Sequence, residues 1–391
     1  MKLARVDNLQ PGQILGRSLF NERREIELAI GTQLDRDKID VLNRKRFTYV
    51  YIWEISDGEF VAPQELIADT IKAANSKDIA TALNDLRSHE ALQKLDPETV
   101  VKEISQSISL RTLLPYTKIE DVAGKILEEV LRKDVRLFSS LPVKQEAGSD
   151  IDHALDVSVL SIMLSNALGV PYEQLMTISV AGLLHDSGLW VLNTAADNSN
   201  DTLTQDLYEE HPVLSMLMIR QARPEKELEQ TIVRQHHESI GGSGFPDGLE
   251  GSDTPVDLSE DVKPNGIHPL SMIVAVANRY VALVSGRAEH KLHTPEKALA
   301  KLVKDSGVFW NTHVVTELIK IVQLYPMGAH IRIKDCSNPQ FTGCSGIVIA
   351  NSPLDPTKPT VILTHDFRGG AIQPKRIVLA REEKVSLELV L

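Results

Sequence analysis

The chain has 391 residues, of which 42% are hydrophobic, 25% charged and only 5% aromatic. This composition excludes wholesale disorder, and the length predicts roughly two to four domains. Against 42 Lys and Arg stand 54 Asp and Glu, which gives a formal net charge of −12. So acidic a chain is a poor candidate for binding long nucleic acid, because that binding depends on basic surfaces.

Cysteine content and hydropathy bear on the compartment. Cys336 and Cys344 are the only cysteines and do not form a Cys-x-x-Cys pair, which argues against a disulfide framework or a thiolate zinc site. The first residues lack the apolar core of a signal peptide. His185 and Asp186 interrupt the most apolar stretch, so we expect no membrane span and a cytoplasmic protein.

The first part of the chain reads as mixed α/β and then helical. Alternating apolar residues predict strands at 26–34 and 47–53. Helical periodicity predicts helices at 36–45, 63–76, 96–110 and 119–133. The third of these has Asp96 as its N-cap and Pro97 at its first position.

The middle of the chain predicts an all-α core. Seven helices follow one another at 150–168, 171–186, 206–222, 226–237, 269–286, 294–307 and 311–326. After Pro326 the pattern changes to five short apolar or alternating runs between turn residues, which favours a small β domain. The predicted domains are an N-terminal domain over 1–125, a helical domain over 126–325 and a β domain over 326–391.

Five of the twelve histidines follow a pattern in the helical region. His153 comes first, the doublet His185–Asp186 ends an apolar helix, His211 falls within a helix, and His236–His237 ends another helix before a glycine-rich loop. Imidazoles and one carboxylate suit zinc, manganese or iron, and a carboxylate can bridge two metals. Spacing alone leaves a metal site and ordinary core histidines as open alternatives. The remaining seven read as ordinary side chains: His89, His268, His290, His293, His313, His330 and His365.

The order LLHDSG, EEHP and HHESIGGSGFPDGLEG resembles the HD-GYP family of the HD phosphohydrolase superfamily. The resemblance covers about 150–325, and the segments before and after it are similar to those that accompany HD-GYP domains. It implies a mainly α fold, with an all-α HD-type core between a small mixed α/β N-terminal domain and a small β C-terminal domain. It also implies a metal-dependent phosphodiesterase that hydrolyses the bacterial second messenger cyclic di-GMP.

The resemblance also implies a set of site residues. The metal ligands would be His153, His185, Asp186, His211, His236, His237 and Asn278, with Asp186 as the bridge. Asp186 and Arg287 are the candidate catalytic residues; Arg287 matches an arginine that could hold a phosphate, and a surface salt bridge is its alternative. The namesake loop contains Gly242, Gly244, Phe245 and Pro246. Ser149 replaces the glutamate that holds a third metal in some members, so we expect one or two divalent ions.

Three positions depart from the family pattern. Asn278 stands where the last ligand is an aspartate, Leu189 where a lysine grips the substrate phosphate, and Gly241 where the loop has an acid. A lost electrostatic contact typically costs roughly 10²–10³ in rate, so these changes predict weakened catalysis. Arg279, beside Asn278, could replace part of the missing lysine charge, or could be a surface side chain.

Two functions remain open from the sequence. The first is a weakened phosphodiesterase of cyclic di-GMP or of a similar small phosphate diester, since Leu189 makes part of the pocket wall apolar. The second is an inactive module that binds nucleotide or docks a signalling protein through the glycine loop. Turnover distinguishes them, because binding without hydrolysis indicates the second.

Overall fold

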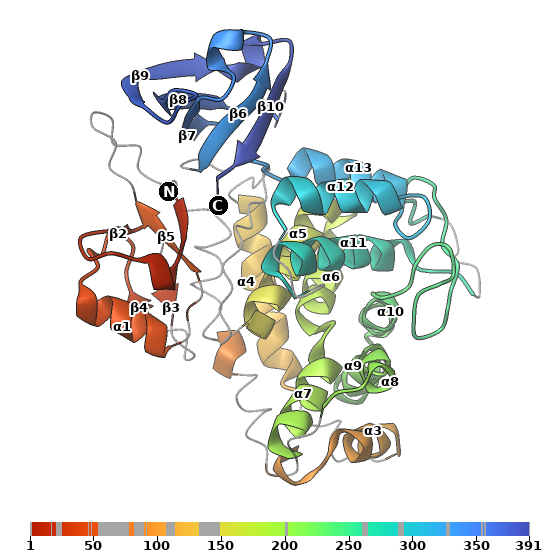
Figure 1. The fold of residues 1–391 in the computed structure, drawn as a ribbon. Helices are drawn as coiled ribbons and strands as arrows, with labels where there is room; N and C mark the ends of the chain where they lie inside the picture. Colours follow the sequence, from red (N-terminus) through yellow and green to blue (C-terminus); the bar gives the residue numbers. More distant parts are fainter. Residues whose placement is uncertain are drawn as a thin grey trace. The chain divides into compact units, whose positions relative to one another are not determined.

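The computed structural model describes most of the chain (Figure 1). The described residues are 2–16, 18–20, 26–45, 47, 49–53, 78–81, 90, 92–106, 114–132, 149–199, 202–259, 265–287, 293–325, 329–352, 355 and 357–390. Contacts divide the chain into two compact units, one from residues 1–66, 141–149 and 322–391 and the other from residues 67–140 and 150–321. The helix predicted at 63–76 lies outside the described residues, and the predicted domain boundaries stay predictions.

The N-terminal part of the first unit is mixed α/β, as predicted. Its three-stranded antiparallel sheet has the order β1 (Lys2–Arg5), β5 (Tyr49–Trp53), β2 (Ile14–Leu15). A separate hairpin pairs β3 (Leu19–Phe20) with β4 (Ile26–Leu28). Helix α1 (Arg36–Arg44) begins where the Asp35 carboxylate accepts from the Lys38 amide at 2.9 Å. Leu15, Leu42 and Ile52 are buried in its apolar core.

The C-terminal part of the first unit is a five-stranded antiparallel sheet. Its order is β10 (Val385–Leu389), β6 (His330–Cys336), β7 (Ser345–Ala350), β8 (Thr360–His365), β9 (Ala371–Val378). Each strand falls on one of the five predicted runs. Ile331 and Ile333 are buried while the residue between them is exposed, which is the alternation expected of a strand with one face in the core.

The second unit is helical and holds the site. Its helices include α3 (Pro97–Gln106), α4 (Tyr116–Arg132), α5 (Ser149–Ala167), α6 (Tyr172–Leu184), α7 (Ser187–Ser199), α8 (Gln205–Glu209), α9 (His211–Ala222), α10 (Glu227–Gln235), α11 (Pro269–Ser285), α12 (Pro295–Asp305) and α13 (Thr312–Ile321). Asp96 caps α3 as predicted, because its carboxylate accepts from the Thr99 amide at 2.9 Å. The mainly α fold with small sheets at both ends of the chain is therefore confirmed.

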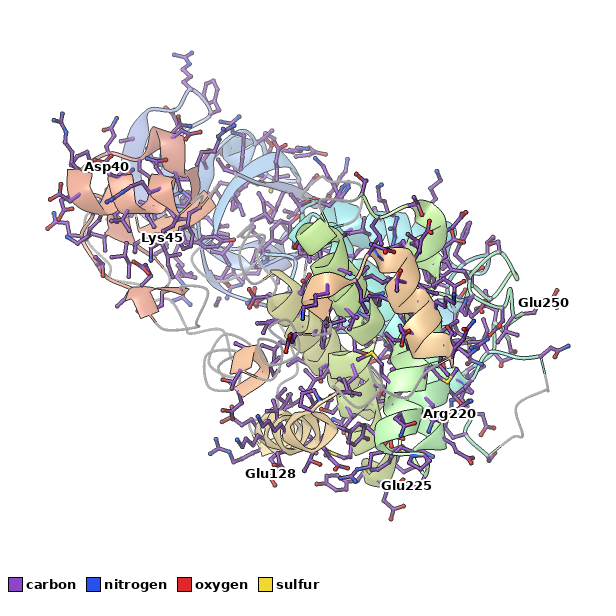
Figure 2. The ribbon with its side chains drawn as sticks, turned by 90° about the horizontal axis from the view of Figure 1, so that it is seen from below. Asp40, Lys45, Glu128, Arg220, Glu225 and Glu250 are labelled. Carbon is purple, nitrogen blue, oxygen red and sulfur yellow. The ribbon has the colours of Figure 1, made fainter. Side chains whose placement is uncertain are left out.

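Burial explains which helices form the interior. Helix α4 is amphipathic, with Val122 and Ile126 buried and Glu128 exposed. Figure 2 shows Glu128, Arg220 and Glu225 directed to the outside of the helical unit. Helices α5, α6 and α11 are instead apolar on nearly every face and are buried among their neighbours. These buried helices carry or adjoin the residues of the candidate site.

The helical region differs from the prediction in two places. Helix α7, directly after Asp186, was not predicted as a separate element. The helix predicted over 206–222 divides at Glu210, because Pro212 lacks the amide hydrogen that a continuous helix would need and instead lies in the first turn of α9. His211 lies in a helix, as predicted, and is the first residue of α9.

Among the described residues, the segment Tyr172–Asp197 is long and apolar enough to cross a membrane by length and composition alone. Within its most apolar 18-residue window, 89% of the residues are buried inside the fold. The same property is expected of core helices, and α6 and α7 together make up this segment.

Candidate metal centre

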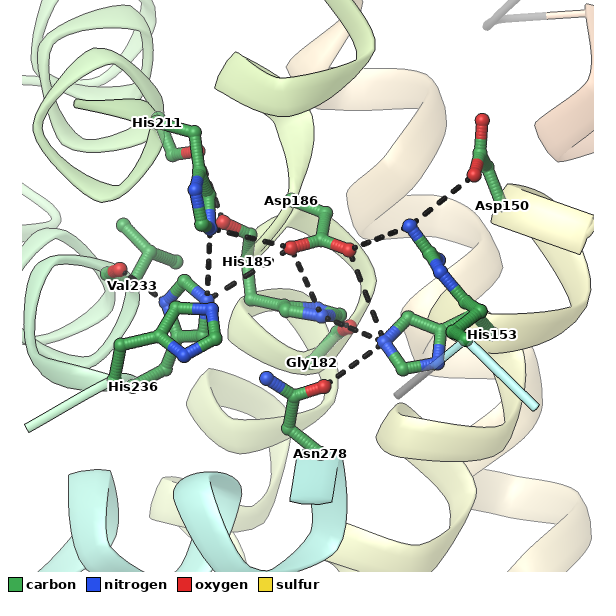
Figure 3. A network of polar contacts seen from close by, with 12 residues as sticks. Asp150, His153, Gly182, His185, Asp186, His211, Val233, His236 and Asn278 are labelled. Carbon is green, nitrogen blue, oxygen red and sulfur yellow. Dashed lines mark hydrogen bonds and ion pairs between the residues drawn. The ribbon is translucent and has the colours of Figure 1, made fainter. Parts of the chain in front are cut away.

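The fold brings the polar residues of the sequence pattern together around one carboxylate. His153 lies on α5, His185 and Asp186 lie between α6 and α7, His211 begins α9, and His236 directly follows α10 (Figure 3). All five are buried. His237, the next residue, is half-buried, and Asn278 reaches the group from α11. Side chains up to 125 positions apart in the sequence thus share one buried site.

Asp186 lies at the centre of the group. Its Oδ1 lies 3.4 Å from Nε2 of His185, 3.4 Å from Nε2 of His211 and 3.8 Å from Nε2 of His236. Its Oδ2 lies 3.7 Å from Nε2 of His153. One carboxylate therefore faces four imidazoles, three of them at Oδ1 and the fourth at Oδ2.

The hydrogen bonds of three imidazoles determine their tautomers. Nδ1 of each donates to the carbonyl three residues earlier: His185 to Gly182 at 2.9 Å, His211 to Tyr208 at 2.6 Å and His236 to Val233 at 2.6 Å. A neutral imidazole that is protonated on Nδ1 has its lone pair on Nε2, the atom that faces Asp186. This backbone support is the arrangement that orients histidine ligands toward a metal.

Two of these lone pairs face each other. Nε2 of His211 lies 3.2 Å from Nε2 of His236, and neither atom carries a proton in the tautomer that its backbone bond selects. Two lone pairs and a carboxylate oxygen repel one another at this distance unless a cation lies between them. The donor set on this side of Asp186 therefore fits a divalent metal.

His153 has a different environment. Its Nε2 lies 2.9 Å from Oδ1 of Asn278 and 3.2 Å from Nε2 of His185. The amide oxygen of Asn278 accepts, so Nε2 of His153 carries the proton and its lone pair is on Nδ1, which is buried without a partner among the described residues. The ring must change tautomer before its Nε2 can bind a metal.

The candidate ligands form two groups that share Asp186. One consists of Asp186, His211, His236 and His237, and the other of His153, His185 and Asp186; within each group the ligand atoms lie within 4.8 Å of one another. Nitrogen and carboxylate donors at these separations are able to bind divalent metal ions. The geometry brings together all the residues that the sequence pattern singled out, with Asp186 in the position of a bridge.

Burial and neighbouring charges keep these groups in the protonation states that a metal needs. Burial lowers the pKa of His153 well below its ordinary value, and the nearby Arg287 lowers it further. Burial and the neighbouring imidazoles likewise lower the pKa of His236 and His237. For Asp186, burial opposes ionisation, but the facing histidines and Arg287 hold its pKa well below the usual range. His153, His236 and His237 are therefore neutral imidazoles beside an ionised Asp186.

Comparisons with known proteins agree with this centre. A family model described as "HD domain" matches residues 125–258. Cyclic di-GMP phosphodiesterase PA4108 of Pseudomonas aeruginosa is 25% identical over 300 residues, which is 76% of this chain and 67% of that protein. Residues 125–258 therefore match the HD domain family, and the wider chain is similar to curated cyclic di-GMP phosphodiesterases.

Further relatives match over shorter spans. The response regulator RpfG of Xanthomonas campestris, also a cyclic di-GMP phosphodiesterase, is 24% identical over 60% of this chain and 57% of its own length. Cyclic di-GMP phosphodiesterase PdeB of Borreliella burgdorferi is 20% identical over 50% of this chain and 48% of its own length. This chain thus spans about half the length of these two relatives. Among solved structures, the HD-GYP-type protein Bd1817 of Bdellovibrio bacteriovorus aligns over 81% of this chain and 97% of its own, with 17% identity and a TM-score of 0.39.

The glycine loop folds back onto the candidate metal ligands. The Phe245 ring stacks on the His237 ring, with the centroids 4.5 Å apart and the planes inclined by 16°. A Cβ on Gly244 would lie 2.4 to 2.5 Å from backbone atoms of Ser239, Glu238 and His237, so only glycine fits there. Gly242 has a φ of +75°, which also favours glycine, and the Phe245–Pro246 peptide bond is cis. The loop therefore has a close packing role beside His237.

Gly241 has a packing reason for lacking the acid of the family pattern. A Cβ at this position would lie 2.8 Å from the carbonyl oxygen of Val308, which belongs to the loop between α12 and α13. The Ile240 amide donates to the Phe309 carbonyl in the same region, at 3.2 Å. The loop between α12 and α13 takes the space that a side chain at 241 would need.

Arg287 makes ion pairs with Asp186, at the middle of the centre, and with Asp150. Its Nη2 lies 3.2 Å from Oδ1 of Asp150 and 3.4 Å from Oδ2 of Asp186. The side chain is 22% exposed and lines a cavity beside the metal ligands. Of the two predicted alternatives, the surface salt bridge does not describe this geometry, because both partners are largely buried.

The cavity has a volume of about 570 Å³, within the range of small-molecule sites. Its lining combines candidate metal ligands, two of the three positions that depart from the family pattern, two arginines and four aromatic rings. Among its residues are His153, Asp186, His236, His237, Leu189, Asn278, Arg279, Arg287, Tyr208, Phe245, Phe309 and Trp310. Arg279 thus faces the site as well as Arg287.

The sequence interpretation missed three of the aromatic residues. Tyr208 gave one signal, since it lies three positions before His211 and therefore on the same side of a helix. The sequence signal for Phe309 and Trp310 was weaker: they are two neighbouring aromatic residues within a polar turn. Only the packing of the loop between α12 and α13 against the glycine loop brings these two rings to the cavity.

Proposed function

We propose that this protein is a metal-dependent phosphodiesterase that acts on cyclic di-GMP with weak turnover, in the cytoplasm. The observation that carries the proposal is the buried imidazole and carboxylate cluster at the base of a cavity lined with two guanidinium groups. An anionic phosphodiester is the substrate class that such a combination attracts. The curated relatives, which are cyclic di-GMP phosphodiesterases, support this particular diester.

The centre would bind one or two ions of iron, manganese or zinc. The first would be held by Asp186, His211, His236 and His237, since the lone pairs of His211 and His236 already converge. A second would need His153, His185, Asp186 and the amide oxygen of Asn278. A bound metal polarises a phosphoryl oxygen and lowers the pKa of bound water, which is the chemistry that phosphodiester hydrolysis needs.

The protein's own residues position the substrate and set the charge. Arg287 and Arg279 would bind phosphate oxygens at the wall of the cavity, where a guanidinium offers a planar pair of donors. Asp186, held ionised, would keep the ligand side chains oriented toward the centre through its contacts to the four imidazoles. The aromatic wall and Leu189 would exclude water from one side of the bound diester.

Weak turnover is proposed because two charges are absent from this cavity. Asn278 contributes a neutral oxygen 2.9 Å from His153, where an aspartate would add negative charge to the second ion site. Leu189 is 6% exposed and makes its part of the lining apolar, so no ammonium group is available there for a phosphate. Each contact of this kind is worth roughly 10²–10³ in rate.

The same two positions favour the alternative of an HD-GYP module that binds the nucleotide without hydrolysing it, or that docks a signalling protein through the glycine loop.

The test is to load the purified protein with manganese or iron and to measure both binding of cyclic di-GMP and the appearance of pGpG or GMP. Asp186→Asn is the matched control. Binding with slow, Asp186-dependent turnover supports the enzyme. Binding at full affinity without any turnover supports the alternative.

A further inference from the structure

The loop between α12 and α13 presents an exposed aromatic ring to the cavity that holds the metal ligands. Phe309 is 43% exposed, an unusual setting for a phenylalanine, and it lines the cavity together with the half-buried Trp310. The two ring centroids lie 6.4 Å apart with the planes inclined by 40°. Among the exposed large hydrophobic residues that the structure describes, Phe309 is the one in this lining.

Hydrogen bonds on both sides hold this loop in place. The side-chain amide of Asn311 donates through Nδ2 to the backbone carbonyls of Ser252 and Thr254, at 2.8 Å each. The Asp253 carboxylate accepts from the amide and the hydroxyl of Thr312, at 2.6 and 2.9 Å.

The backbone beside the rings is fixed as well. The Phe309 carbonyl accepts from Ile240 at 3.2 Å, and the Trp310 carbonyl accepts from Gly307 at 2.8 Å. A ring held on such a rigid backbone loses little conformational entropy when a ligand stacks on it.

The cavity lining combines two kinds of chemistry. The imidazoles, Asp186 and two guanidinium groups suit a phosphodiester, and the rings of Phe309 and Trp310 suit a planar aromatic ligand group. A nucleotide joins these two groups in one molecule. Stacking of a base on an aromatic side chain is a general mode of nucleotide binding, because every base has a π-face.

We infer that Phe309, with Trp310 beside it, is a stacking platform for one purine base of the bound cyclic dinucleotide. The inference rests on the proposed function, which supplies a substrate with two purine bases. It assigns the α12–α13 loop to base recognition, whereas the helix ends and arginines hold the phosphates. The loop thereby contributes affinity for nucleotides over simple phosphate esters.

The test is to measure dissociation constants for a hydrolysis-resistant phosphorothioate analogue of cyclic di-GMP and for inorganic phosphate, both with the metal-loaded protein. Phe309→Ala should weaken binding of the analogue about 5- to 100-fold, the range expected for loss of one stacked base. Phe309→Trp should keep the affinity within about threefold. Inorganic phosphate, which has no base, should bind equally well to all variants, and their metal content should be unchanged.

Val308→Ala is the matched control. Val308 lies in the same loop and is 58% exposed, but it does not line the cavity. Its substitution should leave the affinity for the analogue unchanged. Equal weakening by Val308→Ala and Phe309→Ala would show an effect on loop structure and overturn the platform.

Two further outcomes separate the platform from the proposed substrate. If the unmodified protein binds the analogue and Phe309→Ala binds it within twofold, the platform is refuted and the proposed function stands. If the unmodified protein binds metal and phosphate but not the analogue, the proposed substrate and the platform are both refuted.

Discussion

Restoring a carboxylate at Asn278 should convert the weaker side of the metal centre into a second strong site. Asn278 Oδ1 lies 2.9 Å from Nε2 of His153, and that atom lies 3.7 Å from the Asp186 carboxylate, so the new charge would lie among the proposed ligands. Asn278→Asp changes the charge with almost no change in volume. The variant should bind about two ions per chain where the natural protein binds about one.

The magnitude follows from the short distances and the burial. Two unit charges 4 Å apart gain about 4 kcal/mol at an effective dielectric constant of 20. Asn278 is only 7% exposed, so desolvation of the new carboxylate offsets part of this gain. We expect a net gain of about 1.4–2.8 kcal/mol, which is a 10- to 100-fold tighter second site.

In the metal-free protein, Asn278→Asp should instead lower the stability of the fold. The new carboxylate would face Asp186 without a cation between them, and two buried like charges repel. After chelation, Asn278→Asp should therefore unfold at a lower temperature than the natural protein, and saturating manganese should reverse the order, because binding to the folded state stabilises it.

Elemental analysis and calorimetric titration with manganese measure the stoichiometry and both affinities. Asn278→Leu is the control, since it removes the oxygen without adding charge and should weaken the second site further. Two equally tight sites in the natural protein would refute the reasoning, as would an Asn278→Asp variant whose second site is no tighter than before.

Four other outcomes are expected. Asp186→Asn should remove most of the bound metal, since both ligand groups share this carboxylate; retention of more than half an equivalent per chain would contradict the bridge. Leu189→Lys combined with Asn278→Asp should raise cyclic di-GMP turnover at least tenfold, about 1.4 kcal/mol off the barrier, and product formation measured by chromatography checks this. Gly241→Asp should lower the free energy of unfolding by about 1–3 kcal/mol, because its Cβ would lie 2.8 Å from the Val308 carbonyl oxygen. An unchanged melting temperature would show that the loop between α12 and α13 moves to make room for the side chain. The metal-free protein should lose stability as the pH falls below about 6.5, because histidines whose pKa is lowered by burial bind protons in the unfolded chain but not in the folded one; denaturant titrations at several pH values measure the slope, and a flat profile would contradict it.

The sequence alone determined much of this protein. Local periodicity is enough to predict a helical core and a β domain, because helices and strands place apolar side chains at fixed intervals. The cap at Asp96 was likewise readable from neighbouring residues. The ordered histidines and Asp186 indicated a family and a set of candidate ligands, since these residue types carry their chemistry wherever the fold brings them together.

Only the tertiary structure decided how those residues act together. Helix packing brings His153 and Asn278 into contact across 125 positions, and the carbonyls at helix ends select the tautomers of the other histidines. Contacts between two distant loops account for Gly241 and place Phe309 at the cavity. Sequence periodicity is local, whereas the distance between two side chains depends on how whole helices and loops pack, and that packing makes one side of the centre ready for a metal and leaves the other dependent on a neutral amide.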